Sequence, residues 1–145
     1  MQIPYFEEIN DELACAGQPS AAQFQELADE GYEIVFNLAM DNSIGYLENE
    51  KQLVESAGMR YIHLPVNWGE PQIYDVLKYF AMLGGLRGKR VLTHCTLNAT
   101  SSCFVYMYRR FILKHDEKQA RHTMARYTRL TPAWIDIIDQ ASALH

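Results

Sequence analysis

The chain has 145 residues, which predicts one domain over residues 1–145, because two domains would each be too short for a stable core. Hydrophobic residues make up 48% and charged residues 21%, an ordinary globular composition that excludes a disordered or fibrous chain. The net charge is −5 and no block of Lys or Arg occurs, so we expect neither nucleic acid nor an anionic membrane as a partner.

The cysteines, the histidines and the first residues restrict the chain further. The three Cys form no CxxC pair, which argues against a disulfide framework or a zinc ribbon and favours a reducing compartment. The five His have no metal-binding spacing, so we expect no metal and no cofactor. No apolar run reaches the ~18 residues of a membrane span. Met1-Gln2-Ile3-Pro4 lacks the regions of a signal peptide, so a cytoplasmic location is expected.

Strand and helix patterns alternate along the first two thirds of the chain. Ser20 and Gln23 form a capping-box pattern at the first helix. In chain order we predict a strand over 13–17, a helix over 21–30, a strand over 34–38, a helix over 47–57, a strand over 59–64, a helix over 73–83 and a strand over 90–94.

Only helix patterns follow residue 94. Helices are predicted over 101–113, over 117–127 after a cap at Asp116, and from Thr131-Pro132 to 144. The fold class is therefore α/β, a three-layer α/β/α arrangement with a small, mainly parallel sheet and a helical C-terminal half. In such sheets ligands bind beyond the carboxyl ends of the strands, so the site should lie among loops 39–46, 65–72 and 95–101. Asp41 and Asn42 are further candidates for lining it.

The segment after the last predicted strand carries most of the chemical information. Cys95 ends that strand and faces the start of a helix, where free N–H groups and the helix dipole stabilise anions. Such surroundings favour a thiolate nucleophile, and the same N–H groups can hold the oxygens of a phosphoryl group. The simpler interpretation is that Cys95 is one more buried strand residue.

Several segments resemble one known family. His94-Cys95, a short loop and a Ser-rich helix start are similar to the phosphate loop of cysteine-dependent protein tyrosine and dual-specificity phosphatases. The closer resemblance is to the small bacterial family of beta-lactamase-hydrolase-like phosphatase domains. The shared segments, spread over residues 13 to about 110, are Ala16-Gly17-Gln18-Pro19-Ser20, Asn37-Leu38, Glu50 to Gly58-Met59 and Tyr61, Leu64-Pro65-Val66, and His94-Cys95 with Asn98.

The resemblance implies a cysteine-phosphatase-like fold and a role for each matching residue. Cys95 corresponds to the nucleophile that forms a phosphocysteine, and His94 to the residue that supports the loop and the thiolate. Asn98 corresponds to a position that holds the turn, and Ser101 or Ser102 to a hydroxyl that aids thiolate release. The implied anion-binding loop is Thr96, Leu97, Asn98, Ala99, Thr100 and Ser101.

The sequence departs from the family at the phosphate-binding arginine. The signatures Cys-x5-Arg and Cys-x4-Arg would place Arg at Ser101 or Thr100, and no Lys or Arg occurs between Arg90 and Arg109. Arg109 lies about 12 Å further along the predicted helix, at ~1.5 Å per residue. Arg126 or Arg129 could reach the loop from elsewhere in the fold, although no motif requires it.

The family's general acid is also missing. Asn67 stands where the family has an Asp, and an amide cannot protonate a leaving group. Glu70 is the nearest alternative acid in the loop, ahead of Asp75 in the next helix, and its simpler interpretation is a solvated carboxylate. Trp68 adjoins this position and is expected to pack the loop rather than to gate the pocket.

We therefore expect a phosphatase-like domain that binds a phosphorylated or anionic ligand at Cys95 and is weakly active or inactive, a pseudophosphatase. One alternative is an active phosphatase whose Arg and acid come from elsewhere. Another is a thiol redox or sulfur-transfer protein, with Cys103 as a resolving thiol or simply a core residue. The last is an interaction module in which Cys95 has no role.

Overall fold

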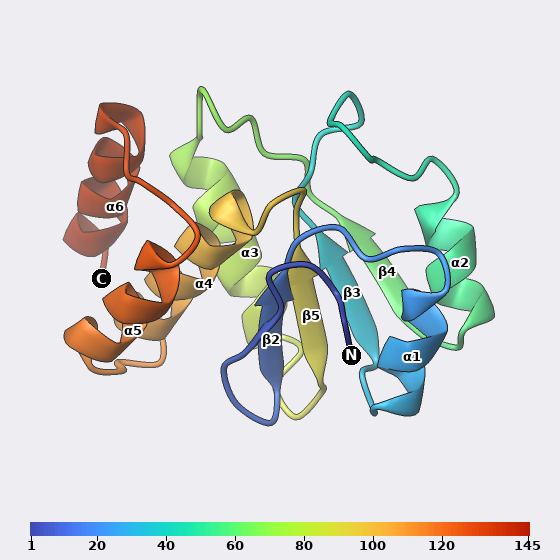
Figure 1. Cartoon of the computed structure of the whole chain (residues 1–145). Coiled ribbons are helices and arrows are strands. Elements are labelled where there is room, and N and C mark those ends of the chain that lie inside the picture. Colours follow the sequence, from blue (N-terminus) through green and yellow to red (C-terminus); the bar gives the residue numbers. More distant parts are fainter.

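Four short segments form the parallel part of the sheet in the structure, a computed structural model that describes residues 1–145 (Figure 1). They are β2 (Leu13–Ala16), β3 (Ile34–Asn37), β4 (Arg60–His63) and β5 (Val91–His94), and each confirms a predicted strand. A fifth strand, β1 (Glu7–Glu8), was not predicted because two residues show no periodicity. It pairs antiparallel with β2 and gives the order β1-β2-β5-β3-β4.

All six predicted helices are present, with different ends. They are α1 (Gln23–Asp29), α2 (Glu50–Ser56), α3 (Ile73–Gly84), α4 (Ala99–Phe111), α5 (Glu117–Ala125) and α6 (Pro132–Ala143). None of them is both long enough and apolar enough to cross a bilayer.

The helix caps follow the sequence in two cases and differ in a third. Asp116 and Thr131 accept hydrogen bonds from backbone N–H groups in the first turns of α5 and α6, as predicted. The capping box at Ser20 is only half formed. The Gln23 side chain accepts from the Ser20 backbone N–H at 2.9 Å, while Ala22 occupies the N-cap position without a side-chain bond.

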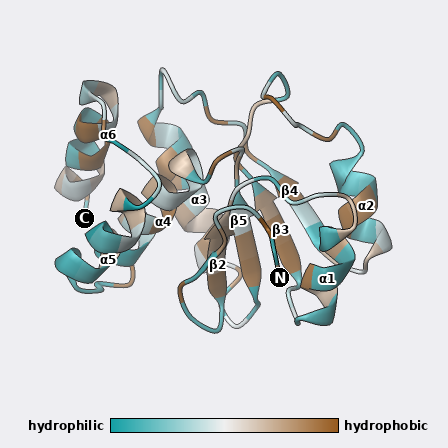
Figure 2. Cartoon of the chain, in the orientation of Figure 1, coloured by the Kyte–Doolittle hydropathy of each residue, from teal (hydrophilic) through white to brown (hydrophobic).

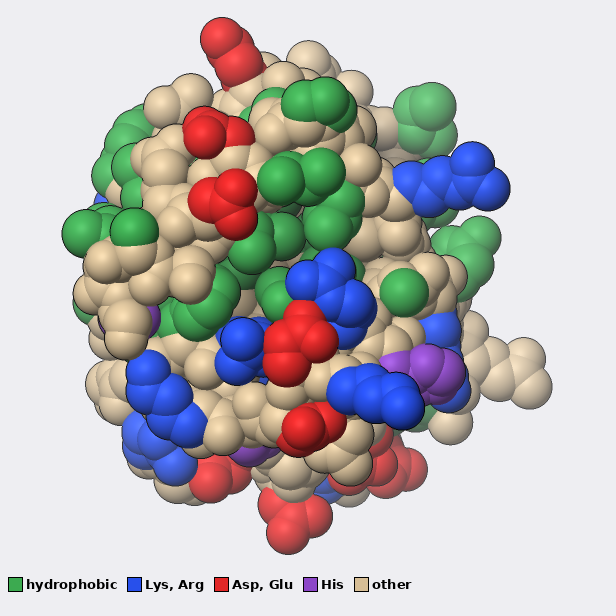
Figure 3. Space-filling view, turned by 90° about the vertical axis from the view of Figure 1, so that its left-hand side faces the viewer, with side chains coloured by type: hydrophobic (Ala, Val, Ile, Leu, Met, Phe, Trp, Pro, Cys, Tyr) green, Lys and Arg blue, Asp and Glu red, His purple; other side chains and the backbone are tan.

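The strands place alternate residues in two separate cores, which makes the three predicted layers. Ile34 and Phe36 belong to a core of 28 buried residues beneath α3 to α6, whereas Val35 and Leu92 belong to one of 10 beneath α1 and α2. The central strands are accordingly strongly hydrophobic, while α5 is largely hydrophilic (Figure 2). Acidic, basic and hydrophobic side chains lie side by side on the α5–α6 face (Figure 3).

The turn after β2 touches the loop after β5. Gly17 forms an isolated bridge with Leu97, and the Gln18 N–H donates to the Thr96 carbonyl at 3.0 Å. A Cβ atom at Gly17 would lie 2.8 Å from the Thr96 carbonyl oxygen and 3.2 Å from that of Pro4. Glycine is therefore required here by close backbone approach.

Replacing Gly17 with Ala should destabilise the protein by about 1–3 kcal/mol, because two backbone carbonyls rather than flexible side chains must move. The matched control is Gly84→Ala in α3, where a Cβ atom meets nothing within 4 Å. The control should be neutral or stabilising by up to ~1 kcal/mol, since Ala is the better helix former. Urea denaturation measures both changes. Equal effects of the two substitutions would contradict this explanation.

Candidate functional site

Three loops meet around a cavity of about 440 Å³ beyond the carboxyl ends of β3, β4 and β5. It is lined by residues within 38–43, 66–68 and 95–100, which agree with the predicted site-bearing loops. Asn42 lines the cavity, but Asp41 does not. Eight of the 13 lining residues are hydrophobic, and none is Lys, Arg, His, Asp or Glu. Cys95 is the only one whose side chain can become charged.

Cys95 lies at the joint between β5 and α4. It is the first residue after β5, and only 4% of it is exposed to solvent, at the cavity. The first N–H groups of a helix have no partner within the helix, so those at the start of α4 are available to an anion. The Ser101 N–H already points at the Cys95 sulfur, at a distance of 3.5 Å between nitrogen and Sγ. The local geometry therefore suits a thiolate.

Asn98 fixes the backbone conformation between β5 and α4. Its backbone is left-handed, with φ of 66°, and this reversal lets α4 begin at Ala99 rather than at the predicted Ser101. Its side-chain amide donates to the Tyr5 carbonyl at 2.8 Å and to the Cys15 sulfur at 3.5 Å. Asn98 is fully buried and does not line the cavity, so it holds the turn and offers no side-chain contact to a ligand there.

The structure separates the other predicted loop residues into two groups. Thr96, Leu97, Ala99 and Thr100 line the cavity together with Cys95. Ser101 does not line it: the residue is fully buried, and its hydroxyl has no hydrogen-bond partner. Its backbone N–H is thus the group that reaches the sulfur.

No arginine lines the cavity in place of the missing one. Arg109 is held on the far side of α4, where its guanidinium donates to the Thr123 hydroxyl on α5 at 3.2 Å. Arg126 pairs with Glu7 at 3.2 Å. Arg129 is exposed and is not among the lining residues. Thr100, at one of the two positions where the resemblance would place an arginine, is 6% exposed.

The loop after β4 is fixed by tryptophan packing. Trp68 lies against Trp134 of α6 with ring centroids 4.9 Å apart, and the Trp134 indole donates to the Trp68 carbonyl at 2.9 Å. Asn67 lines the cavity, and its side-chain oxygen accepts from the Gly69 N–H at 2.9 Å. Glu70 is exposed and does not line the cavity. The structure thus brings Asn67 and Trp68, but not Glu70, to Cys95.

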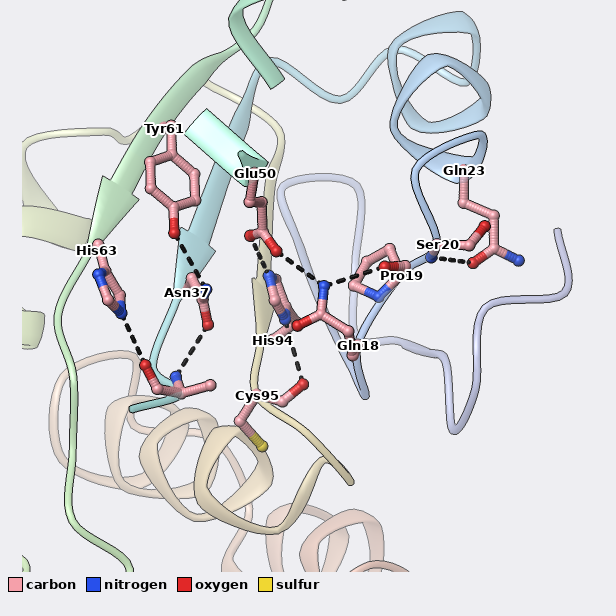
Figure 4. A network of polar contacts seen from close by, with 11 residues as sticks. Gln18, Pro19, Ser20, Gln23, Asn37, Glu50, Tyr61, His63, His94 and Cys95 are labelled. Atoms are coloured by element: carbon pink, nitrogen blue, oxygen red, sulfur yellow. Dashed lines mark hydrogen bonds and ion pairs between the residues drawn. The ribbon is translucent and has the colours of Figure 1, made fainter. Parts of the chain in front are cut away.

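A buried polar network lies beneath the loop (Figure 4). His94 is fully buried; its Nε2 lies 2.6 Å from Glu50 Oε2, and its Nδ1 lies 3.2 Å from the Cys95 carbonyl oxygen. Gln18 donates to the other carboxylate oxygen of Glu50 at 2.7 Å. Sequence reasoning assigned no role to Glu50. Its only signal was its place among the segments that carry the family resemblance.

The other two thiols are core residues. Burial raises the pKa of Cys15 to about 12 and that of Cys103 to about 12 as well. Cys103 is fully buried within α4, which favours the core interpretation over a resolving thiol. No group of three His, Cys, Asp or Glu side chains is arranged to hold a metal ion.

Iodoacetamide at about pH 8 should modify the native protein at Cys95 alone, because thiols with a pKa near 12 stay protonated and unreactive at that pH. Mass spectrometry of tryptic peptides checks this, with Cys95→Ser as the variant that should take up no label. In denaturant all three cysteines should react. Native labelling of Cys15 or Cys103 before Cys95 would contradict the assignment.

Comparison with solved structures places this geometry among known folds. TpbA of P. aeruginosa, solved in complex with pTyr, superposes with a TM-score of 0.69 at 20% identity, over 96% of this chain and 81% of that chain. PTPMT1, solved in complex with PI(5)P, superposes with a TM-score of 0.81 at 16% identity, over 97% and 96%. These two similarities show the cysteine-phosphatase fold.

A more similar structure identifies the family. No family model and no curated protein sequence matches the chain. A candidate phosphatase of the DUF442 family from Shewanella putrefaciens CN-32, however, superposes with a TM-score of 0.90 at 32% identity, over 99% of this chain and 94% of that chain. The chain therefore belongs to the DUF442 family of phosphatase-like proteins.

Proposed function

We propose that this chain is a protein tyrosine phosphatase-like domain that binds a phosphorylated or similar anionic group at Cys95 and turns it over weakly or not at all. The observation that carries this proposal is a cysteine sulfur held against a helix N-terminus in a cavity without a single cationic side chain. The loop's geometry supports binding, and its lack of charge argues against efficient catalysis.

The cysteine and the N–H groups at the start of α4 suit the first chemical step, the attack on phosphorus. A Cys95 thiolate would attack phosphorus, forming an S–P bond while the bond to the leaving oxygen breaks. Free N–H groups at the start of α4 would hold the phosphoryl oxygens. The Ser101 N–H, 3.5 Å from the sulfur, stabilises the thiolate before attack. Water would then hydrolyse the phosphocysteine.

Two groups that would stabilise the transition state, an arginine and a general acid, are missing. An arginine contacting a transferred phosphoryl group in GTPases is worth about 10³–10⁵ in rate, and a positioned general acid about 10²–10⁴. Thr100 carries no charge, and Asn67 has no acidic proton to give. An activated aryl phosphate needs little help from an acid, so it is the substrate on which residual turnover is most readily seen.

The cavity walls indicate what the phosphoryl group is attached to. Leu38, Met40, Val66, Trp68 and Leu97 all line the cavity, and Leu97 is 60% exposed. We propose a ligand with an apolar, uncharged body beside its phosphoryl group. The pTyr bound by TpbA and the PI(5)P bound by PTPMT1 support a phosphorylated ligand, and of these two only pTyr carries an apolar ring beside its phosphoryl group. The absence of nucleic-acid and membrane partners and the cytoplasmic location stay predictions.

Hydrolysis of p-nitrophenyl phosphate by the wild type, Cys95→Ser and Thr100→Arg proteins tests the proposal. We expect little or no wild-type turnover, none in Cys95→Ser, and a gain of about tenfold or more in Thr100→Arg, because the guanidinium binds phosphoryl oxygens in the transition state. Gln52→Arg, on the exposed side of α2, is the control for added charge.

Two outcomes would point elsewhere. Fast wild-type turnover that disappears in Cys95→Ser would replace the proposal with a working phosphatase. If Thr100→Arg and Gln52→Arg are equally inactive while both stay folded, the arginine position is not the missing element, and the sulfur-transfer and interaction-module alternatives gain weight.

A further inference from the structure

The buried pair beneath the Cys95 loop is an unusual feature of this core. Glu50 is 1% exposed and His94 is fully buried, and they come from the first residue of α2 and the last residue of β5. A buried ion pair seldom stabilises a protein more than well-packed apolar residues would. Core stability therefore does not explain why these two side chains stand here.

The hydrogen-bond partners of the pair favour a proton on each ring nitrogen of His94. The Cys95 carbonyl can only accept, so His94 Nδ1 at 3.2 Å must carry a proton. The 2.6 Å contact between Nε2 and Glu50 Oε2 holds a second proton. An ionised carboxylate is the better acceptor in this contact, which favours placing that proton on the imidazole. The Gln18 amide donates to Glu50 Oε1 at 2.7 Å and further favours the ionised carboxylate.

This arrangement places a positive pole next to the nucleophile. A doubly protonated ring would donate from Nδ1 to the backbone of Cys95 itself, while the Glu50 carboxylate lies on the opposite side of the ring (Figure 4). The cavity wall contributes no other cation. The positive end of the pair therefore faces the residue that benefits from it.

One further titratable group faces the pair. Tyr61 of β4 accepts a hydrogen bond from Asn37 at 3.1 Å, and burial followed by the nearby Glu50 raises the pKa of Tyr61 far above its usual value. Tyr61 therefore remains neutral over the working range. Gln18, from the turn after β2, cannot titrate.

We propose that Glu50 is a positioning residue that holds His94 doubly protonated beneath the Cys95 loop, so that this pair supplies the positive pole that Thr100 does not. The proposal rests on the proposed function in treating Cys95 as the reactive group. Its test measures the reactivity of the Cys95 thiol itself. The outcome can therefore be interpreted even if the protein neither binds nor hydrolyses a phosphate.

The decisive variant is Glu50→Gln. The introduced amide can accept from Gln18 through its oxygen and donate to His94 Nε2 through its nitrogen, so the network keeps its geometry. His94 then needs only its Nδ1 proton and becomes neutral. Glu55→Gln, exposed on the same helix, is the matched control because it removes the same charge.

The measurement is the rate of Cys95 alkylation by iodoacetamide as a function of pH. In Glu50→Gln we expect the profile to move to higher pH by about one unit, with an approximately tenfold slower reaction near pH 6–7, because less of the thiol is ionised there. Glu55→Gln should follow the wild type. A Glu50→Gln profile that superimposes on the wild-type profile would overturn the proposal.

A second measurement needs no variant, in case Glu50→Gln does not fold. Nitrogen-15 NMR of the wild-type protein at neutral pH distinguishes ring nitrogens that carry a proton from those that do not, and His94→Asn or comparison with the four other histidines assigns the signal. Two protonated nitrogens in His94 support the proposal. A bare Nε2 refutes it, because the shared proton would then belong to Glu50.

Discussion

The structure depends on the reversal of the chain between β5 and α4, where a sulfur atom meets unpaired N–H groups. That reversal needs a left-handed residue, and Asn98 provides it with φ of 66°. The Asn98 amide is bound to the Tyr5 carbonyl at 2.8 Å, and the turn at Gly17 packs directly on the Thr96 carbonyl. The N-terminal segment and the Cys95 loop therefore stabilise each other, although about 80 residues separate Gly17 from Asn98.

The site has the backbone geometry of an anion-binding loop but no charged side chain in its cavity wall. The loop combines a helix N-terminus, a cysteine and a buried histidine, all of which the fold brings together. The two positions where the family resemblance would place an arginine and an acid hold Thr100 and Asn67, and both of these uncharged residues line the cavity. Binding of a compact anion relies on backbone dipoles, which remain. Fast phosphoryl transfer relies on charged side chains, and the cavity wall contains none of Lys, Arg, His, Asp or Glu.

Much of the fold could be predicted from the sequence because strand alternation, helix periodicity and caps are local signals. The four parallel strands and the Cys95 joint are examples. The misses have physical causes. β1 is too short to show a period, and α4 begins two residues early because Asn98 tolerates the left-handed backbone. Nearness in sequence suggested Glu70, but the turn after Asn67 places it away from the cavity.

The role of Glu50 was the least predictable part of the site. It lies 44 residues from its partner His94, at a helix start that local pattern alone marks as surface. Only the strand order, which sets β5 beside β3 and brings α2 over that end of the sheet, reveals that its carboxylate is buried. Contacts between distant segments produce no periodic pattern in the sequence, so the burial of an acidic residue of this kind can be recognised only from the structure.

The central claim is that the Cys95 loop still binds an anion without an arginine. The most direct measurement is the rate at which iodoacetamide alkylates Cys95 as tungstate or inorganic phosphate is added at fixed ionic strength, with sodium chloride as the control salt. Saturable protection of Cys95, stronger in Thr100→Arg than in the wild type, is the predicted result. An alkylation rate that neither anion changes beyond the effect of the control salt would contradict the claim.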